Sequence, residues 1–179
     1  MINVVKKYWS ILLIAAIIVF LDQWTKELVR NNLPFGATWL PESLQWLSPY
    51  ARIVHWYNTG AAFGMFKDAS MILTVLAFIV IGAILFYYPQ VENDDWSLRL
   101  ALSMQLGGAL GNLVDRLTIG HVTDFVSVGN FPVFNVADAS ITLGAVVLFL
   151  GVWIHERAEK QAEKQAAASV DLPGETTSE

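Results

Sequence analysis

The sequence predicts an all-α membrane protein with four transmembrane helices and a small extracytoplasmic β-containing subdomain in the first outer loop. Three observations support this fold class. The 179-residue chain is 55% hydrophobic with a mean hydropathy of +0.48, only 15% of its residues are charged, and four of its segments approach the length of a bilayer-spanning helix. A chain of this length suits one domain, which we place at residues 1–160.

The first spanning helix is expected at about residues 8–28, after Lys6 and Lys7. A basic start followed by an apolar run can also be a secretory signal peptide. Here Asp22 and Gln23 follow the apolar run, and no small-residue cleavage site does. We therefore expect a helix that stays in the mature protein.

Three further apolar segments are expected to form helices at about residues 69–88, 96–116 and 136–155. Pro89 follows the second segment, and the charges of Asp115 and Arg116 end the third. Gly107 and Gly111 have the small-xxx-small spacing that lets helices approach closely. The third helix is therefore expected to pack tightly against a neighbour.

Two segments lie outside these helices. The loop of residues 29–68 contains the alternating stretch "RIVHWYN", which predicts a short strand, and its Trp and Tyr residues favour a small folded unit on the outer leaflet. The tail of residues 161–179 is polar and of low complexity. It is expected to start as a helical extension and otherwise to be disordered.

Positive charges predict the orientation of the chain. Lys6 and Lys7 precede the first helix, and Arg157 and Lys160 follow the fourth, whereas residues 117–135 contain no Lys or Arg. Basic residues favour the cytoplasmic side, so both termini are expected to be cytoplasmic. The acidic connection of residues 90–95 departs from this rule locally.

Composition also excludes several functions. The chain has no Cys, which excludes disulfides, thiolate nucleophiles and thiolate metal ligands. The chain also has no run of basic residues, so the sequence does not indicate a nucleic-acid partner.

Polar residues gather at the outer ends of helices one, three and four and in the two outer loops, whereas the cytoplasmic halves contain few. Ionisable groups near lipid are costly and usually functional. A transport path would need such groups through the full membrane depth, so this distribution favours an enzyme at one interface. The residues are Asp22, Lys26, Asn58, Asn112, Asp115, Arg116, Asp124, Asn135 and Asp138.

Asp124 and Asp138 are separated by a loop that leaves and returns to one membrane face, so their carboxyl groups could meet. Such a pair shares a proton and can act as base and acid in peptide hydrolysis. Two alternatives stay open at this point: a metal site of His121, Asp124 and Asp138 with Asp115 as a further ligand, and a proton relay through Asp22, Asp115, Asp124 and Asp138. Asp22 and Lys26, at i and i+4, are expected to form an ion pair.

Five motifs occur in a fixed order: "DQWTK" at 22–26, "NTGAAFG" at 58–64, "GGALGNLVDR" at 107–116, "HVTDF" at 121–125 and "FNVADASI" at 134–141. Together they resemble the lipoprotein signal peptidase family, the type II signal peptidases of bacteria. The resemblance implies an intramembrane aspartic endopeptidase of the cytoplasmic (inner) membrane, active near the outer leaflet. Such enzymes remove the signal peptide of prolipoproteins before a diacylglyceryl-modified Cys.

The resemblance also implies roles for individual residues. Asp124 and Asp138 match the catalytic pair of the family. The expected partners are diacylglyceryl-modified prolipoproteins and membrane lipids, and we expect a monomer without metal or other cofactor. The positions that match supporting or substrate-binding residues are Asp22, Lys26, Asn58, Gly60, Asn112, Asp115, Arg116 and Asn135.

Overall fold

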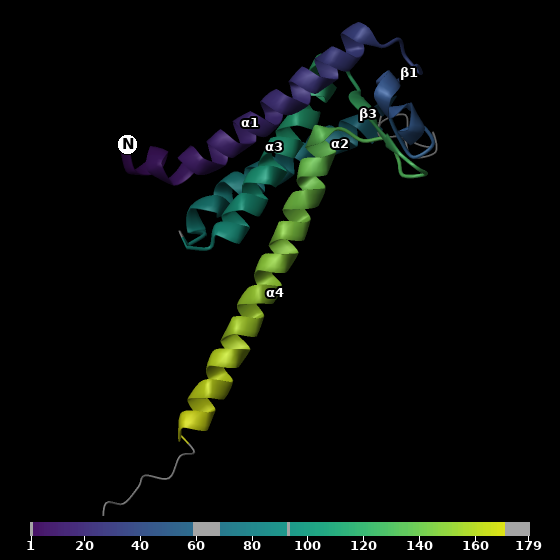
Figure 1. Ribbon diagram of the computed structural model, residues 1–179. Coiled ribbons are helices and arrows are strands. Elements are labelled where there is room, and N and C mark those ends of the chain that lie inside the picture. Colours follow the sequence, from purple (N-terminus) through teal and green to yellow (C-terminus); the bar gives the residue numbers. More distant parts are fainter. Residues whose placement is uncertain (1, 59–68, 93, 171–179) are drawn as a thin grey trace, which may run out of the picture.

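The structure is a computed structural model, and it describes residues 2–58, 69–92 and 94–170. Helices dominate it, with a small sheet at one end of the bundle (Figure 1). The elements are α1 (Ile2–Asn32), β1 (Thr38–Trp39), the 3-10 helix η1 (Glu42–Leu47), β2 (Ala51–Asn58), α2 (Ala69–Tyr87), the 3-10 helix η3 (Tyr88–Gln90), α3 (Trp96–Thr118), β3 (Val122–Val128) and α4 (Val136–Val170).

All four expected helices are present, and two are longer than expected. α1 covers Ile2–Asn32 where we expected about 8–28, and α4 continues to Val170. The tail starts at residues 161–170 as the helical extension that was expected, and the disorder expected beyond it stays a prediction for residues 171–179, which lie outside the described part. Residues 156–168 consist largely of Ala, Glu, Lys and Gln, which are strong helix formers, and Glu156 pairs with Lys160 one turn later at 3.6 Å.

Three helices of the described residues are long and apolar enough to cross a membrane: Tyr8–Asn32, Ser70–Gln90 and Val136–Arg157. α3 is not among them, because it carries Ser, Gln, Asn, Asp and Arg side chains. It instead packs against α1, α2 and α4, with 12 buried residues. The fourth membrane span at α3 stays a prediction.

Glycine residues let α3 approach its neighbours closely, as the small-xxx-small spacing predicted. A Cβ atom at Gly107 would lie 2.8 Å from the Cβ of Ile18 in α1. A Cβ at Gly108 would lie 2.5 Å from the carbonyl oxygen of Ala137 in α4. Both distances are too short for a side chain, so glycine is required for this packing.

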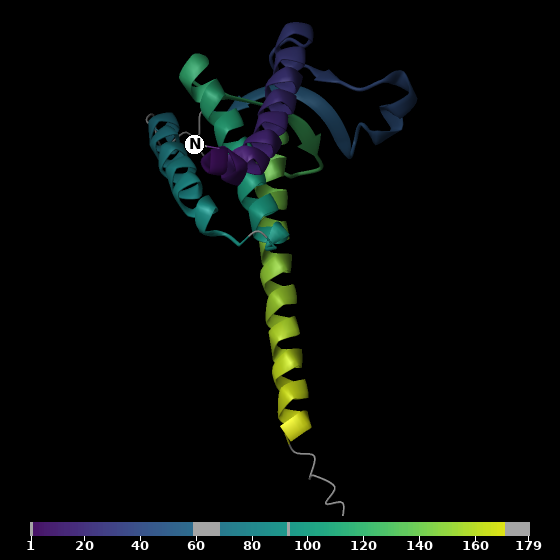
Figure 2. The same cartoon turned by 90° about the vertical axis from the view of Figure 1, so that its left-hand side faces the viewer.

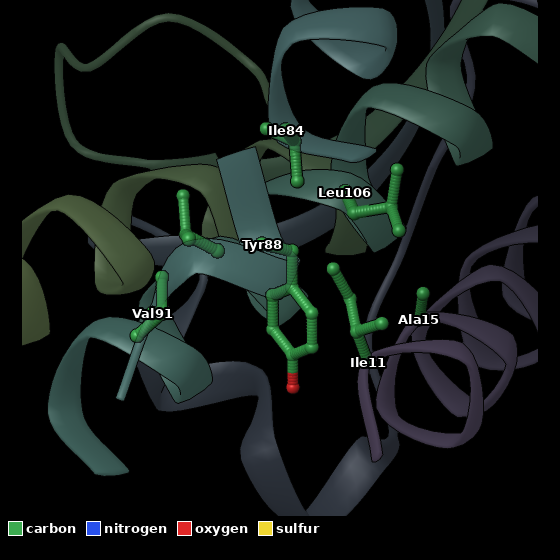
Figure 3. Packing of buried hydrophobic residues seen from close by; sticks show 7 residues of the cluster. Ile11, Ala15, Ile84, Tyr88, Val91 and Leu106 are labelled. Atoms are coloured by element: carbon green, nitrogen blue, oxygen red, sulfur yellow. The ribbon is translucent and has the colours of Figure 1, made fainter. Parts of the chain in front are cut away.

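A hydrophobic cluster joins α1, α2 and α3 at the end of the bundle away from the sheet (Figure 3). Ile11 and Ala15 come from α1, and Leu106 from α3. Tyr88 is fully buried among them, and its hydroxyl lies 2.8 Å from the hydroxyl of Ser10. This cluster holds the helices together without any of the polar groups of the other end.

The sheet is antiparallel with the order β1-β2-β3. β2 confirms the strand expected from "RIVHWYN". The β-containing unit is not confined to the first connection, however, because β3 comes from the segment between α3 and α4. Figures 1 and 2 show the sheet where α1 ends and α4 begins, while the other ends of these two helices point away from it.

Candidate active site

The local sequence places Asp138 in the first turn of α4. Asn135 precedes the helix, and its Oδ1 accepts a hydrogen bond from the backbone N–H of Asp138 at 2.9 Å. The backbone N–H of Asn135 donates in return to Oδ2 of Asp138 at 3.4 Å. This reciprocal pair is a capping box, which satisfies two backbone donors that a helix start would otherwise leave without partners. Asp138 is thereby held at the helix mouth.

Two asparagine side chains connect the carboxyl groups of Asp124 and Asp138. Asn135 Nδ2 donates to Asp124 Oδ1 at 2.7 Å, and Asn112 Nδ2 donates to Asp138 Oδ1 at 2.8 Å. The two amides also contact each other, because Asn135 Nδ2 lies 3.1 Å from Asn112 Oδ1. The fold therefore joins two carboxyl groups from β3 and α4 through a continuous hydrogen-bonded path.

Lys26 determines which way the amide of Asn112 faces. Its Nζ lies 3.0 Å from Asn112 Oδ1, and it also pairs with Asp22 at 2.7 Å and with Asp115 at 3.3 Å. An ammonium group can only donate, so the amide oxygen of Asn112 must face Lys26 and the amide nitrogen must face Asp138. The expected ion pair between Asp22 and Lys26 is confirmed.

Asp22 and Asp115 each connect two elements next to this path by a hydrogen bond from the carboxyl group to a backbone N–H. Oδ1 of Asp22 accepts from the backbone N–H of Ala137 at 2.9 Å, which links α1 to the first turn of α4. Oδ2 of Asp115 accepts from the backbone N–H of Thr123 at 2.9 Å, which links α3 to β3 beside Asp124. Both carboxyl groups are buried, so their contribution is to hold the backbone around the pair.

Two residues of α1 that the sequence did not single out belong to the same cluster. Arg30 Nη1 lies 3.4 Å from Asp115 Oδ1 and donates to Thr123 Oγ1 at 3.1 Å. Gln23 Nε2 donates to the carbonyl oxygen of Gly111 at 3.0 Å. Arg30 follows Lys26 by four positions and so shares its helix face, which is the signal that could have found it. Gln23 offered no such signal.

Asp124 is 2% exposed, and its pKa is raised to about 7, mainly by burial and next by the negative charge of Asp138. The hydrogen bond from Asn135 acts in the opposite direction and lowers the pKa. A carboxyl group with this pKa keeps its proton in about half of the molecules at neutral pH. Asp124 is thus able to act as an acid where an exposed carboxyl could not.

Three of the expected site residues remain: Arg116, Asn58 and Gly60. Arg116 is half-buried and makes no salt bridge with a carboxylate of the described residues, although its charge acts on Asp138 and Asp124 over a longer range. Asn58 ends β2 opposite Val122 of β3. Gly60 lies outside the described residues, so its expected role is not placed.

A groove of about 560 Å³ opens beside Asp138. Its lining consists of Asn58 at the end of β2, residues 131–134 before α4, and residues of α4 from Asp138 to Leu143. Its walls are mainly apolar, so the groove could hold an apolar chain against the carboxyl group.

His121 was a candidate ligand of the alternative metal site, and the structure shows it in an aromatic contact instead. Its ring packs on Tyr57 with 4.5 Å between ring centroids. Within the part of the chain that the structure describes, no three His, Asp or Glu side chains are grouped as metal ligands.

The buried charged side chains of the described residues are Asp22, Lys26, Asp115 and Asp124, and all four lie at the sheet end of the bundle. In the other half of the described residues, the buried polar side-chain groups are the hydroxyls of Ser97, Ser103 and Tyr88. This confirms the one-sided distribution read from the sequence for the described residues. The fold and the site together define a helical membrane protein with a buried acidic site at one end.

Comparisons with known proteins agree. The family model described as "Signal peptidase (SPase) II" matches residues 14–154. The lipoprotein signal peptidase of Halalkalibacterium halodurans is 37% identical over 158 residues, which cover 86% of this chain and 97% of that protein. That of Mesorhizobium japonicum is 37% identical over 161 residues, which cover 87% and 91%. The chain therefore belongs to the signal peptidase II family, a family of peptidases that process prolipoproteins.

Solved structures show the same fold. A bacterial membrane enzyme solved by the in meso method at 1.9 Å resolution matches with a TM-score of 0.71 and 27% identity, over 80% of this chain and 92% of that one. A second, solved at 2.3 Å, matches with a TM-score of 0.70 over 80% and 87%.

Proposed function

We propose that this chain is an aspartic endopeptidase that cleaves prolipoproteins immediately before a diacylglyceryl-modified Cys, with Asp124 and Asp138 as the catalytic pair. The observation that carries the proposal is the path from Asp124 through the amides of Asn135 and Asn112 to Asp138. A path of this kind holds two carboxyl groups in fixed orientations near each other. Paired carboxyl groups that share one proton are suited to hydrolysis of an amide.

Asp124 is proposed as the protonated member of the pair at the start of the reaction, because burial and the charge of Asp138 raise its pKa to about 7. Asp138 is proposed as the ionised member, since each of its oxygens accepts a hydrogen bond. Asp138 takes a proton from a water molecule while the water oxygen attacks the scissile carbonyl carbon. Asp124 gives its proton to the carbonyl oxygen, which forms a tetrahedral diol.

The intermediate then collapses, and the carbon–nitrogen bond breaks. The leaving nitrogen takes a proton from Asp138, a hydroxyl of the diol returns its proton to Asp124, and the products are a carboxylic acid and an amine. The pair regains its starting protonation, so no other reactant than water is consumed. Acid–base assistance of this kind accounts for about 10²–10⁴-fold of the rate, and positioning of the peptide adds to it.

The other polar residues act on the pair through contacts. Asn112 and Asn135 orient the two carboxyl groups, and Lys26 orients Asn112. Asp22 and Asp115 hold the backbone of α4 and β3. Arg116 is proposed to stabilise the negative charge of the pair from a longer distance, and Asn58 and Gly60 to bound the substrate groove.

The membrane arrangement that fits this chemistry has four spans, with α3 as the span surrounded by the others. Both termini lie in the cytoplasm and the sheet lies at the outer leaflet of the cytoplasmic (inner) membrane, as the positive charges predict. The signal helix of the substrate then lies beside the enzyme in the bilayer, and its lipid chains lie in the outer leaflet. A single chain supplies both carboxyl groups, so the proposed active form is a monomer.

The test is cleavage of a diacylglyceryl-modified precursor by the purified chain in lipid. Asp124→Asn and Asp138→Asn are each expected to abolish cleavage, because Asn keeps the shape of the side chain but neither donates nor takes up the required proton. Asp94→Asn is the matched control, since Asp94 is exposed in the connection before α3 and its loss should leave turnover unchanged. Substantial cleavage by either site variant would show that the pair is not catalytic. Loss of wild-type cleavage on chelation, restored by Mg²⁺, would favour a metal-dependent hydrolase instead.

A further inference from the structure

A second pocket, of about 510 Å³, lies between the outer end of α1 and the sheet. Its helix wall is formed by Thr25, Leu28, Val29 and Asn32, which recur at the spacing of one helix face. Phe125 of β3 forms part of the opposite wall. The side chain before it, Asp124, instead contacts Asn135, so this pocket is separate from the groove beside Asp138.

The chemistry of the walls favours a hydrocarbon ligand. The two polar side chains of the helix wall are turned to their own helix, since Thr25 Oγ1 donates to the carbonyl oxygen of Leu21 at 2.7 Å and Asn32 Nδ2 to that of Leu28 at 2.8 Å. The sheet contributes Trp39 and Ile53. Neither donor is thus directed into the pocket for a polar ligand, and the remaining wall is aliphatic and aromatic.

The position of the pocket beside an apolar helix indicates that such a ligand comes from the surrounding membrane. Its helix wall lies within Tyr8–Asn32, one of the three helices apolar enough to cross a membrane. Leu28 is 46% exposed at the wall, and Leu21, one turn before Thr25 on the same face, is also exposed. Leu21 and Leu28 therefore form an apolar strip of α1 that leads to the pocket, and Thr25 between them directs its hydroxyl to the carbonyl oxygen of Leu21.

We propose that this pocket is a lipid site that holds an acyl chain of a bilayer phospholipid, entering along the face of α1 that carries Leu21 and Leu28. The occupant is a chain of the surrounding membrane and not of the substrate, so the site is filled in the resting protein. A bound chain packs against Phe125 and thereby supports β3 beside Asp124. The proposal does not depend on the peptidase mechanism.

Two buried wall residues make it possible to distinguish a chain bound inside the pocket from lipid that only contacts the surface of α1. Val29 is 9% exposed and Phe125 is 6% exposed. Lipid that merely surrounds α1 reaches Leu28 but not these two side chains. A chain inside the pocket reaches all three, so chemical labelling of Phe125 reports entry.

The experiment uses the full chain, without substrate, in nanodiscs of phosphatidylethanolamine and phosphatidylglycerol. A small fraction of the lipid carries a photoactivatable diazirine near the end of one acyl chain, and labelled residues are located by mass spectrometry after irradiation. Labelling is expected at Val29 and Phe125 as well as at Leu28. A lipid with the diazirine on its headgroup is expected to label neither Val29 nor Phe125.

Ile53→Trp fills the pocket and is expected to remove the labelling of Phe125 while the exposed side chain of Ile79 in α2 stays labelled. Ile79→Trp is the matched control, because it adds the same bulk outside the pocket and should leave Phe125 labelled. If Ile53→Trp fails to fold by circular dichroism, Leu28→Trp at the exposed wall serves as the second variant with the same expectation. Absence of labelling at Phe125 in the wild type, or labelling that neither filling variant reduces, would overturn the proposal.

Discussion

Replacement of Asp124 by Asn tests the burial of this carboxyl group through stability alone. Asn has the same shape and can still accept the 2.7 Å hydrogen bond from Asn135, but it does not titrate. In the folded protein, burial and the charge of Asp138 raise the pKa of Asp124 from 3.8 to about 7. The folded state therefore binds this proton more tightly than the unfolded state does.

The sign of the effect follows from this difference. The stabilisation by the protonated carboxyl group is fully present below about pH 4 and is lost as the pH rises through the folded pKa near 7. A shift of about three pKa units at about 1.4 kcal/mol each sets an upper limit of about 4 kcal/mol. Between about pH 5 and pH 8 the wild type should lose about 3 kcal/mol of unfolding free energy relative to Asp124→Asn.

The assay is reversible unfolding by SDS in mixed micelles, followed by circular dichroism at both pH values. Taking the difference between wild type and variant removes the contributions of the titrating groups that do not contact Asp124. Asp94→Asn again serves as the control and should follow the wild type. A variant whose stability changes with pH as much as that of the wild type would refute the reasoning, because Asp124 would then have an ordinary pKa.

The remaining predictions concern packing, charge and rate. Lys26→Met leaves the buried carboxylate of Asp22 without its cation and Asp115 with Arg30 alone, and it should lower the unfolding free energy by about 3–5 kcal/mol in the same SDS assay; a near-neutral change would contradict the buried ion pairs. Gly108→Ala places a Cβ 2.5 Å from the carbonyl oxygen of Ala137 and should cost at least about 1–3 kcal/mol, whereas Gly82→Ala meets nothing within 4 Å and should gain up to about 1 kcal/mol. Equal thermal stabilities of these two variants would be inconsistent with the close approach of α3 to α4. The cleavage rate kcat/KM should fall about tenfold per pH unit above about pH 7, as Asp124 loses its proton, and a level rate up to pH 9 would argue against its role as the acid.

Prediction from the sequence succeeded where the signal is local. The apolar runs located all four helices, and the alternation in residues 52–58 located β2. The pair Asp22 and Lys26 could be predicted because residues four positions apart share a helix face. The helical start of the tail was also predicted, and the strong helix formers in this segment explain why the helix continues to Val170.

The candidate site was only partly predictable. The polar residues near the predicted ends of the helices indicated which side chains would lie at one side of the membrane. Nothing in the chain indicated that β3 would pair with β2, with Asp124 opposite Trp56. The part of Arg30 in the cluster was also missed, since its partner Thr123 lies 93 positions away in the chain.

The sequence by itself determined which segments are helical and apolar, because hydrophobic content and spacing act between near neighbours. It also determined the cap in which Asn135 and Asp138 hold each other, since those two residues are only three positions apart. Only the tertiary structure decided that the amide of Asn112 meets Asp138, 26 positions later, and that Asp22 meets the backbone of Ala137, 115 positions later. These contacts depend on how closely α3 packs between α1 and α4, which is a property of all three surfaces together and of none of the segments alone.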